Sequence, residues 1–299
     1  MRDPLELRLR TILPREYQDS YEDVQPVSMG SAGLRVGADG RVAWNEMWAS
    51  FCDLAMAGGP PHKGLLLEPA APAAVAAQPS DYAAVVDEIC RGIRMVSGLE
   101  AESGPTPGWI RVFCDGDAMA GWLLRAIVME NVAARAAGHA LDLPAAPAYR
   151  IEKEIKNVIT VVAKTCHYWT GHMWPAQRFA IGQLFDAMAR ELPLIVPPAV
   201  EESRSHAQRA LAKELAEAIR RETGLVRSDH RYTDWLGVSC TSVRAAVWMM
   251  RMIVVCNVLS RREGTTVFVP VNPAQDPGGG RVAGAVSQVY RLALARGVV

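Results

Sequence analysis

The densest group of potentially reactive side chains lies in residues 164–175, which contain a thiol at Cys166, imidazoles at His167 and His172, and three large aromatic rings. Cysteine sulfur and histidine nitrogen bind transition metals, and a Cys/His pair is also the arrangement of a nucleophile with its base. On one continuous α-helix, His167 and His172 would point about 140° apart, and only a break at residues 170–171 would bring them together. The sequence therefore assigns no metal ligand.

For residues 164–175 two interpretations remain open. In the first, Cys166 and His167 are catalytic and His172 contacts a ligand. In the second, the aromatic residues pack the two halves of the chain together, and the histidines are hydrogen-bonded within that packing.

A second group of reactive residues lies in residues 50–64, where a predicted helix with one cysteine runs into a turn of two glycines and two prolines, followed by a histidine and a lysine. Paired glycines allow a ligand to approach the backbone, an imidazole moves protons near neutral pH, and an ammonium group attracts anions. The same turn is also what a simple helix C-cap requires. The predicted catalytic residues here are Cys52 and His62, and the predicted ligand-binding residues are Gly58, Gly59 and Lys63.

Two almost wholly apolar helices are predicted over residues 118–129 and 243–256. Arg125 is the single charge of the first, and the second has Arg244 at its start and Arg251 within its apolar stretch. A buried guanidinium needs a carboxylate, several carbonyls, an anionic ligand or a route to solvent, because an unpaired buried charge costs several kcal/mol. We therefore predict Arg125 and Arg251 as candidate anion-binding residues, with a structural ion pair or a side chain that reaches solvent as the alternative.

Cys114 and Cys240 each lie at the end of a short apolar strand, directly before a helix. Helix N-termini lower the pKa of a thiol, so either cysteine could act as a nucleophile. Cysteine is also a small buried hydrophobic residue, and no histidine is adjacent to either thiol in the sequence. We expect a structural role for both.

The elements that position these residues occur twice. Residues 109–147 align without a gap with residues 235–273, 126 positions later, with 14 identities in 39 positions that include Trp109/Trp235 and Trp122/Trp248. Similarity at a fixed spacing indicates a repeated structural unit. The sequence predicts an α/β (α+β) fold made by tandem duplication of a βαββα-type unit with additional helices, related by a pseudo-twofold axis. The first repeat is residues 1–148, with an N-terminal loop extension, and the second is residues 149–299.

Within each repeat we expect a long amphipathic helix (residues 81–97 and 202–222), a strand (109–114 and 235–240), a buried helix, a hairpin around Gly138 or Gly264, and a final helix. Proline-ended segments at residues 65–69 and 192–198 would add a strand to each sheet, which would then be mixed. Features present in only one copy are the better candidates for functional sites, because the duplication already explains whatever both halves share.

Composition excludes several classes of protein. Half of the 299 residues are hydrophobic, and 32 basic residues balance 32 acidic ones, so the chain is globular and has no excess charge to attract nucleic acid. The N-terminal residues are charged and lack the apolar region of a signal peptide, and no segment has membrane-spanning length. Six scattered cysteines indicate reduced thiols. We expect a cytoplasmic protein without a membrane or nucleic-acid partner.

The function predicted from these features is the binding of a small, anionic molecule between the two halves, with catalysis by histidine, cysteine or lysine left open. A noncatalytic interaction or assembly protein is the alternative, and a metal or cofactor carrier is the second alternative. The sequence does not specify a cofactor, and it leaves a homo-oligomer open.

Overall fold

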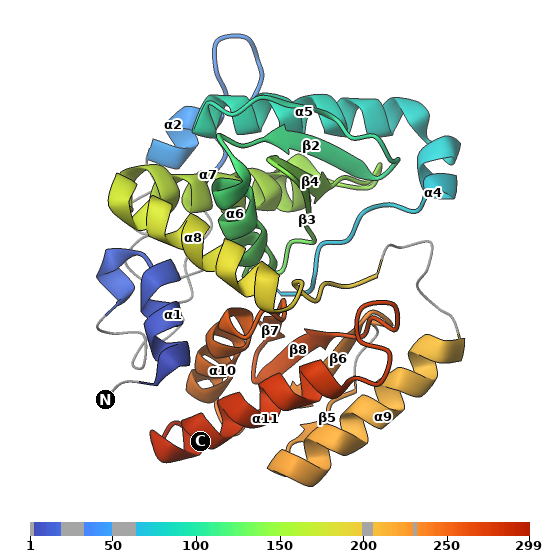
Figure 1. Ribbon diagram of the computed structural model, residues 1–299. Helices are drawn as coiled ribbons and strands as arrows, with labels where there is room; N and C mark the ends of the chain where they lie inside the picture. The colour runs from blue at the N-terminus through green and yellow to red at the C-terminus, as the bar shows by residue number, and fades with distance from the viewer. Residues whose placement is uncertain (1–2, 19–32, 50–63, 199–205, 230–231) are drawn as a thin grey trace. The chain divides into compact units, whose positions relative to one another are not determined.

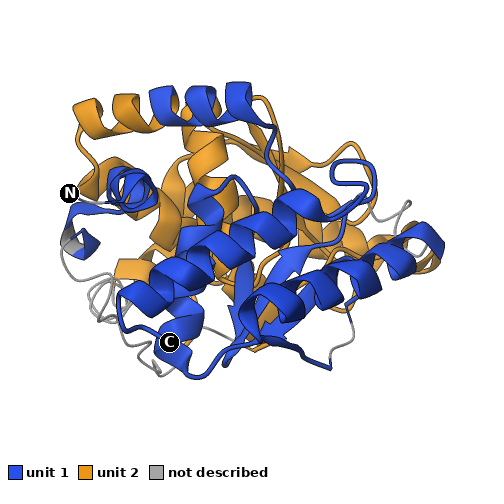
Figure 2. Ribbon diagram, turned by 60° about the horizontal axis from the view of Figure 1, so that its bottom comes forward, with its two compact units in different colours: residues 1–25, 183–299 blue, residues 26–182 orange. Residues whose placement is uncertain are grey.

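The computed structural model describes residues 3–18, 33–49, 64–198, 206–229 and 232–299. It shows a mixed α+β fold with two separate four-stranded antiparallel sheets, each packed with helices (Figure 1). The chain divides into two compact units, coloured separately in Figure 2: unit 1 is residues 1–25 with 183–299, and unit 2 is residues 26–182. The predicted boundary near residue 148 separates sequence repeats and stays a prediction.

Unit 2 contains the first sheet. Its elements are α2 (Trp44–Ala49), α4 (Pro72–Ala77), α5 (Pro79–Ser97), β1 (Ala101–Ser103), β2 (Trp109–Phe113), α6 (Asp117–Met129), β3 (Arg135–Ala137), β4 (Ala140–Pro144), the π-helical turn η2 (Ile151–Ile155), α7 (Lys156–His167) and the π-helical turn η3 (Tyr168–His172). The strand order is β1-β2-β4-β3. α5 contacts β1, α6 contacts β3 and β4, and α7 packs against both helices.

Unit 1 contains the second sheet. Its elements are α1 (Pro4–Ile12), the 3-10 turn η1 (Arg15–Tyr17), α9 (His206–Thr223), β5 (Val226–Arg227), β6 (Trp235–Ser239), α10 (Val243–Val255), β7 (Arg261–Glu263), β8 (Thr266–Pro270) and α11 (Gly280–Ala295). The strand order is β5-β6-β8-β7, α9 contacts β5 and β6, α10 contacts β7 and β8, and α11 packs against both helices. α8 (Pro175–Glu191) begins in unit 2 and ends in unit 1.

The two halves are similar element by element. β2, α6, β3 and β4 begin and end 126 residues before β6, α10, β7 and β8, as 109 and 235 illustrate for the first residues of β2 and β6. The strand register is also the same, because Trp109 lies opposite Pro144 and Trp235 lies opposite Pro270. The predicted strands, buried helices and hairpins of this region are therefore confirmed in both halves.

Both central helices are followed by an asparagine in the left-handed conformation, Asn131 with φ 60° and Asn257 with φ 61°. Asparagine tolerates this conformation better than most residues because its side chain makes local hydrogen bonds. Asn131 Nδ2 donates to the carbonyl oxygen of Gly64 at 3.1 Å, and Asn257 Nδ2 donates to that of Leu192 at 2.6 Å. In each half, the asparagine thus fixes the segment that precedes the long helix against the end of the central helix.

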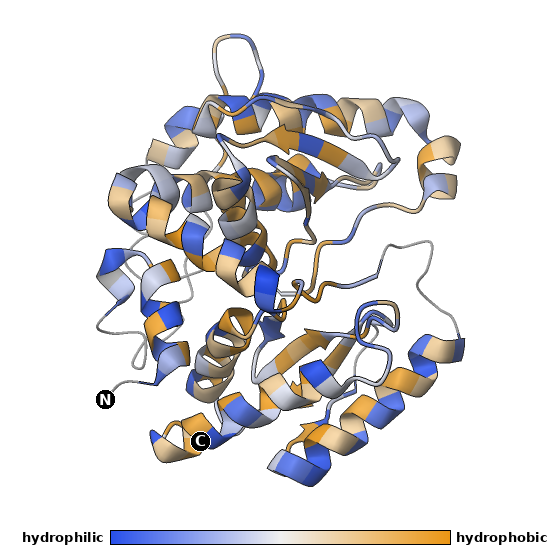
Figure 3. Cartoon of the chain, in the orientation of Figure 1, coloured by the Kyte–Doolittle hydropathy of each residue, from blue (hydrophilic) through white to orange (hydrophobic). Residues whose placement is uncertain are grey.

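Hydrophobic periodicity explains the long helices. In α5, Val85, Ile89 and Ile93 recur every four residues and are buried, Asp81 lies in the first turn, and Gly98 ends the helix with φ 72°. Figure 3 shows the same alternation of hydrophobic and hydrophilic residues along α5 and α9, whereas α10 is hydrophobic over most of its surface. Within the part of the chain that the structure describes, no helix is long and apolar enough to cross a membrane.

The sheets differ from the prediction in the origin of the fourth strand. Each sheet is wholly antiparallel, and its extra strand is β1 or β5, which follows the long helix. The proline-ended segments instead make one parallel bridge each, Leu67 with Val132 and Ile195 with Val258. The prediction of a mixed sheet was therefore wrong. Proline lacks the N–H that would extend such a bridge into a ladder, and both bridges lie outside the named strands, so neither segment adds a strand to its sheet.

Candidate functional site

The two histidines that sequence analysis singled out meet in the structure. His167 is the last residue of α7, and His172 is the last residue of the π-helical turn η3, in which the amide of Met173 donates to the carbonyl of Tyr168 at 3.2 Å. A π-helical turn bonds residue i to residue i+5 and therefore places side chains five apart on the same side. The two Nε2 atoms lie 3.1 Å apart, and the ring centroids 4.9 Å. The predicted 140° separation was wrong because it assumed α-helical geometry.

Aromatic rings surround this pair. The ring of Tyr168 meets that of His172 edge-on at 5.5 Å, and the ring of Trp48 meets that of His167 at 6.1 Å. Both histidines are half-buried. One turn away, buried Trp169 packs against Trp122 at 5.8 Å. The aromatic packing expected of residues 164–175 therefore exists within unit 2, and its predicted role between the two repeats stays a prediction.

The cysteines at the predicted sites are buried. Cys166 is 3% exposed, and burial raises the pKa of its thiol. Burial likewise raises the pKa of Cys114 and of Cys240 to about 12. A thiolate loses its solvation in an apolar interior, so these residues are poorly activated as nucleophiles at neutral pH. The geometry of Cys114 and Cys240 agrees with the structural role expected from the sequence.

Five of the predicted site residues lie outside the described residues. These are Cys52, Gly58, Gly59, His62 and Lys63. Their predicted roles stay predictions.

Arg125 and Arg251 are buried, at 6% and 7% exposed, as their apolar helices predict. Arg125 Nη1 donates to the carbonyl oxygen of Gly121 in the preceding turn at 2.9 Å, and desolvation lowers the pKa of Arg125 to about 10. The Arg251 guanidinium carbon instead lies 5.9 Å from the centre of the Tyr17 ring. The two arginines thus occupy equivalent positions with different neighbours, and anion binding by either stays a prediction.

Unit 2 also contains a buried ion pair that the sequence analysis did not identify. Lys164 Nζ lies 3.2 Å from Glu130 Oε1, and the two side chains are 4% and 6% exposed. Glu130 follows α6 directly, and Lys164 lies within the buried stretch of α7. One signal was available in the sequence, since each residue is a lone charge in an apolar segment.

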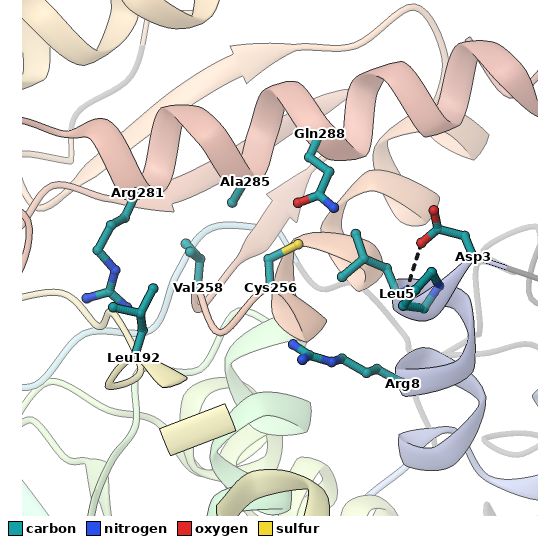
Figure 4. A pocket seen from close by; sticks show the side chains of 10 residues that line it. Asp3, Leu5, Arg8, Leu192, Cys256, Val258, Arg281, Ala285 and Gln288 are labelled. Atoms are coloured by element: carbon teal, nitrogen blue, oxygen red, sulfur yellow. Dashed lines mark hydrogen bonds between the residues drawn. The ribbon is translucent and has the colours of Figure 1, made fainter. Parts of the chain in front are cut away.

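Unit 1 contains a cavity of about 370 Å³ (Figure 4). It is bounded by α1, α11, the residues after α10 and the residue after α8. In Figure 4, Arg281 and Leu192 lie at one end, Leu5 and Asp3 lie at the other, and Cys256 lies between them. The apolar lining residues are Pro4, Leu5, Leu192, Val258 and Ala285, and the polar ones are Asp3, Arg8, Cys256, Arg281 and Gln288.

The charged side chains that line this cavity differ in their partners. Arg8 Nη2 donates to both carboxylate oxygens of Glu191, at 2.8 and 2.9 Å, and Asp3 caps α1 by accepting from the amide of Leu5 at 2.8 Å. Arg281 Nη2 donates only to the carbonyl of Pro193, at 2.6 Å. Its Nε is covered from solvent without a hydrogen-bond partner, and among the described residues no carboxylate lies within 4.0 Å of this guanidinium. Arg281 therefore leaves a net positive charge at one end of the cavity.

Cys256 lies in the middle of the cavity and is half-buried. Desolvation raises the pKa of its thiol to about 12, with a smaller opposing effect from nearby Arg8. The other four cysteines that the structure describes are buried. Cys256 is thus a neutral, weakly polar group at neutral pH and does not oppose an anion beside Arg281.

Two residues of unit 2 that correspond to cavity residues line a much smaller space. Glu130 occupies the position of Cys256, 126 residues earlier, and Val132 occupies that of Val258. The space lined by Glu130, Val132 and α7 has a volume of about 10 Å³, which is the room needed for one water molecule. Unit 2 has a separate cavity of about 380 Å³ between α5 and β1.

No protein-family model matches the chain, and neither a curated protein nor a solved structure shows significant similarity to it. Among the residues that the structure describes, no group of three or more histidine, cysteine or acidic side chains is placed to hold a metal ion. The candidate sites are therefore defined by geometry alone: the cavity in unit 1 and the histidine pair in unit 2.

Proposed function

We propose that this protein binds a small anionic molecule with an apolar part in the cavity of unit 1. The observation that carries the proposal is the Arg281 guanidinium, which lines the cavity with one carbonyl partner and a covered, unpartnered Nε. A carboxylate or phosphate oxygen beside Arg281 would neutralise the charge of the guanidinium. Planar guanidinium groups bind such anions through two parallel hydrogen bonds.

The size and lining of the cavity define the rest of the ligand. A volume of about 370 Å³ lies within the range of small-molecule sites. Leu5, Leu192 and Val258 offer an apolar wall, and the exposed Gln288 supplies an amide for a second polar contact. An organic acid with a short hydrocarbon chain fits this combination better than an inorganic anion does.

The test compares hexanoate, hexylamine and inorganic phosphate by isothermal titration calorimetry at low ionic strength. Hexanoate is expected to bind more tightly than phosphate, because it also covers the apolar wall, and hexylamine is expected not to bind. Arg281→Gln should weaken hexanoate binding by about 10- to 100-fold, which corresponds to one or two hydrogen bonds to a charged group.

Arg291→Gln is the matched control, because Arg291 is an exposed arginine on the same helix. Its binding should equal that of the unmodified protein. Equal affinity for hexanoate and hexylamine, or equal affinity in the Arg281→Gln and Arg291→Gln variants, would contradict the proposal. Absence of binding by both hexanoate and phosphate would favour the alternative of an interaction or assembly protein.

We also infer that the two halves arose by tandem duplication of a βαββα-type unit, with the repeats divided near residue 148. The aligned tryptophans, the shared strand register and the left-handed asparagines support this inference. The duplication accounts for what the halves share. It leaves the cavity of unit 1 and the histidine pair of unit 2 as the features that need a functional explanation.

A further inference from the structure

We propose that His167 and His172 together bind one divalent transition-metal ion through their Nε2 atoms. The proposal concerns unit 2 and is independent of the anion cavity in unit 1. It assigns the protein a second ligand class, a metal ion that favours imidazole ligands.

The distance between the two nitrogens carries the argument. The Nε2 atoms lie 3.1 Å apart. Imidazole nitrogen binds zinc at about 2.0–2.1 Å, so an ion at that distance from both atoms would subtend an angle of about 95–102°. This angle lies between the 90° of octahedral or square-planar coordination and the tetrahedral angle. The pair therefore already has the spacing of two adjacent ligands of one ion.

The backbone holds the pair in this arrangement. His167 directly precedes the π-helical turn η3, and His172 is its last residue. The turn is held by the hydrogen bond from the amide of Met173 to the carbonyl of Tyr168 and by one from Thr170 Oγ1 to the carbonyl of Cys166 at 2.8 Å. Single π-helical turns within helices often occur at functional sites. Ligands that are already positioned by the fold lose little conformational entropy when the ion binds.

The residues around the histidine pair indicate which groups would complete the coordination of the ion. Both imidazoles are half-buried, and Thr170 and Gly171 between them are exposed, so water can supply the remaining ligands. Only two protein ligands are present among the described groups, and such a site exchanges its ion readily. Imidazole suits copper, nickel and zinc rather than magnesium or calcium, and the general order of affinities puts Cu²⁺ first.

The same 3.1 Å separation is also that of a hydrogen bond between two neutral imidazoles, with one Nε2 donating to the other. The two interpretations make different predictions. A hydrogen-bonded pair has no affinity for metal beyond that of any exposed histidine, whereas a chelating pair binds Cu²⁺ more tightly than a single imidazole does.

The experiment is a Cu²⁺ titration of the full, untagged chain, followed by calorimetry and by electron paramagnetic resonance. We expect one ion per chain, bound more tightly than by a single imidazole, and a spectrum with two nitrogen ligands. His167→Gln and His172→Gln should each lower the affinity by at least about tenfold, because loss of an indirect partner of a metal ligand already costs that much. His206→Gln is the matched control, because His206 is exposed on α9 of unit 1.

Three results would overturn the proposal. The first is that the unmodified protein binds Cu²⁺ no better than the double variant His167→Gln/His172→Gln does. The others are a spectrum with a single nitrogen ligand, and Cu²⁺ binding that depends on His62 and not on the histidine pair. The melting temperature of each variant in a chelator shows whether the fold is intact. If His167→Gln fails to fold, the His172→Gln variant still tests whether the pair binds Cu²⁺, because His172 is half-buried and its replacement should disturb the fold less. The Arg281→Gln variant should bind Cu²⁺ normally, so failure of the anion proposal and failure of the metal proposal are distinguishable.

Discussion

Glu130 and Cys256 occupy the same place in the two halves, directly after the central helix and directly before the left-handed asparagine. In unit 2, Glu130 pairs with the buried Lys164 and lines a space of about 10 Å³. In unit 1, Cys256 lines a cavity of about 370 Å³. The strand register and the left-handed asparagine are shared, whereas the residues around this place differ.

The difference lies in the charge at this place. A buried carboxylate needs a counter-charge, and Glu130 has one in Lys164 of α7. Cys256 is neutral at neutral pH and has no such need. The cavity that Cys256 lines is bounded by α1 and α11, and α11, which contains no lysine, supplies Arg281 at one end.

The largest effect is expected from breaking the buried ion pair of unit 2. Lys164→Met should lower the free energy of unfolding by about 3–5 kcal/mol, because it leaves the Glu130 carboxylate buried without its counter-charge. Urea unfolding measures this. Lys153→Met is the control, since Lys153 is exposed, pairs with Glu154 at 3.5 Å, and its loss should cost less than about 1 kcal/mol. Equal costs for the two variants would mean that the buried pair does not stabilise unit 2.

Enlarged side chains should distinguish the cavity of unit 1 from the small space beside Glu130 in unit 2. Val161 lines the small space in unit 2, and Val161→Phe should destabilise the protein by about 1–3 kcal/mol through overpacking. Ala285 lines the cavity in unit 1, so Ala285→Phe should fit with little loss of stability while it abolishes hexanoate binding. Melting temperatures and titration calorimetry measure the two effects. A larger loss of stability in Ala285→Phe than in Val161→Phe would show that the cavity is not open.

The shared asparagines should respond alike in both halves. Asn131→Ala and Asn257→Ala should each cost about 1–2 kcal/mol, the strain of a left-handed conformation for an ordinary residue. Asn131→Gly and Asn257→Gly should recover most of that strain, because glycine adopts positive φ freely. Chemical denaturation of the four variants tests this. A clear difference between the two alanine variants would show that the halves do not depend equally on this turn.

The smallest effect concerns the reactivity of Cys256. With the pKa of its thiol raised to about 12, the rate of alkylation by iodoacetamide should rise about tenfold per pH unit from pH 7 to pH 10. A thiol with the ordinary pKa of 9.0 levels off within this range. Peptide mapping isolates the labelled residue, and hexanoate should slow the reaction. A plateau below pH 9 would show that Cys256 is less desolvated than the cavity implies.

Local patterns in the sequence were sufficient to predict most of the helices and strands. The strands, the central helices and the hairpins were predictable because apolar periodicity and turn glycines depend on neighbours in the sequence. The fourth strand was not predictable, since β1 and β5 are two or three residues long and have little apolar character. The histidine pair was only partly predictable: composition identified His167 and His172, but an α-helical spacing predicted that they would diverge.

The cavity was not predictable at all. Arg8, Cys256 and Arg281 lie far apart in the chain, and none of them belongs to a motif. These three residues come together only when α1, the end of α10 and α11 pack against one another. That packing cannot be predicted from the spacing of residues along the chain.

The order of residues alone establishes two similar halves, each with its helices and strands, because periodicity and repetition are properties of neighbouring positions. Three-dimensional packing alone decides that Glu130 meets Lys164 in one half and that Cys256 and Arg281 line one cavity in the other. It also decides that a π-helical turn brings two imidazoles within 3.1 Å. Burial, distance and unneutralised charge are properties of groups that meet only in the folded chain.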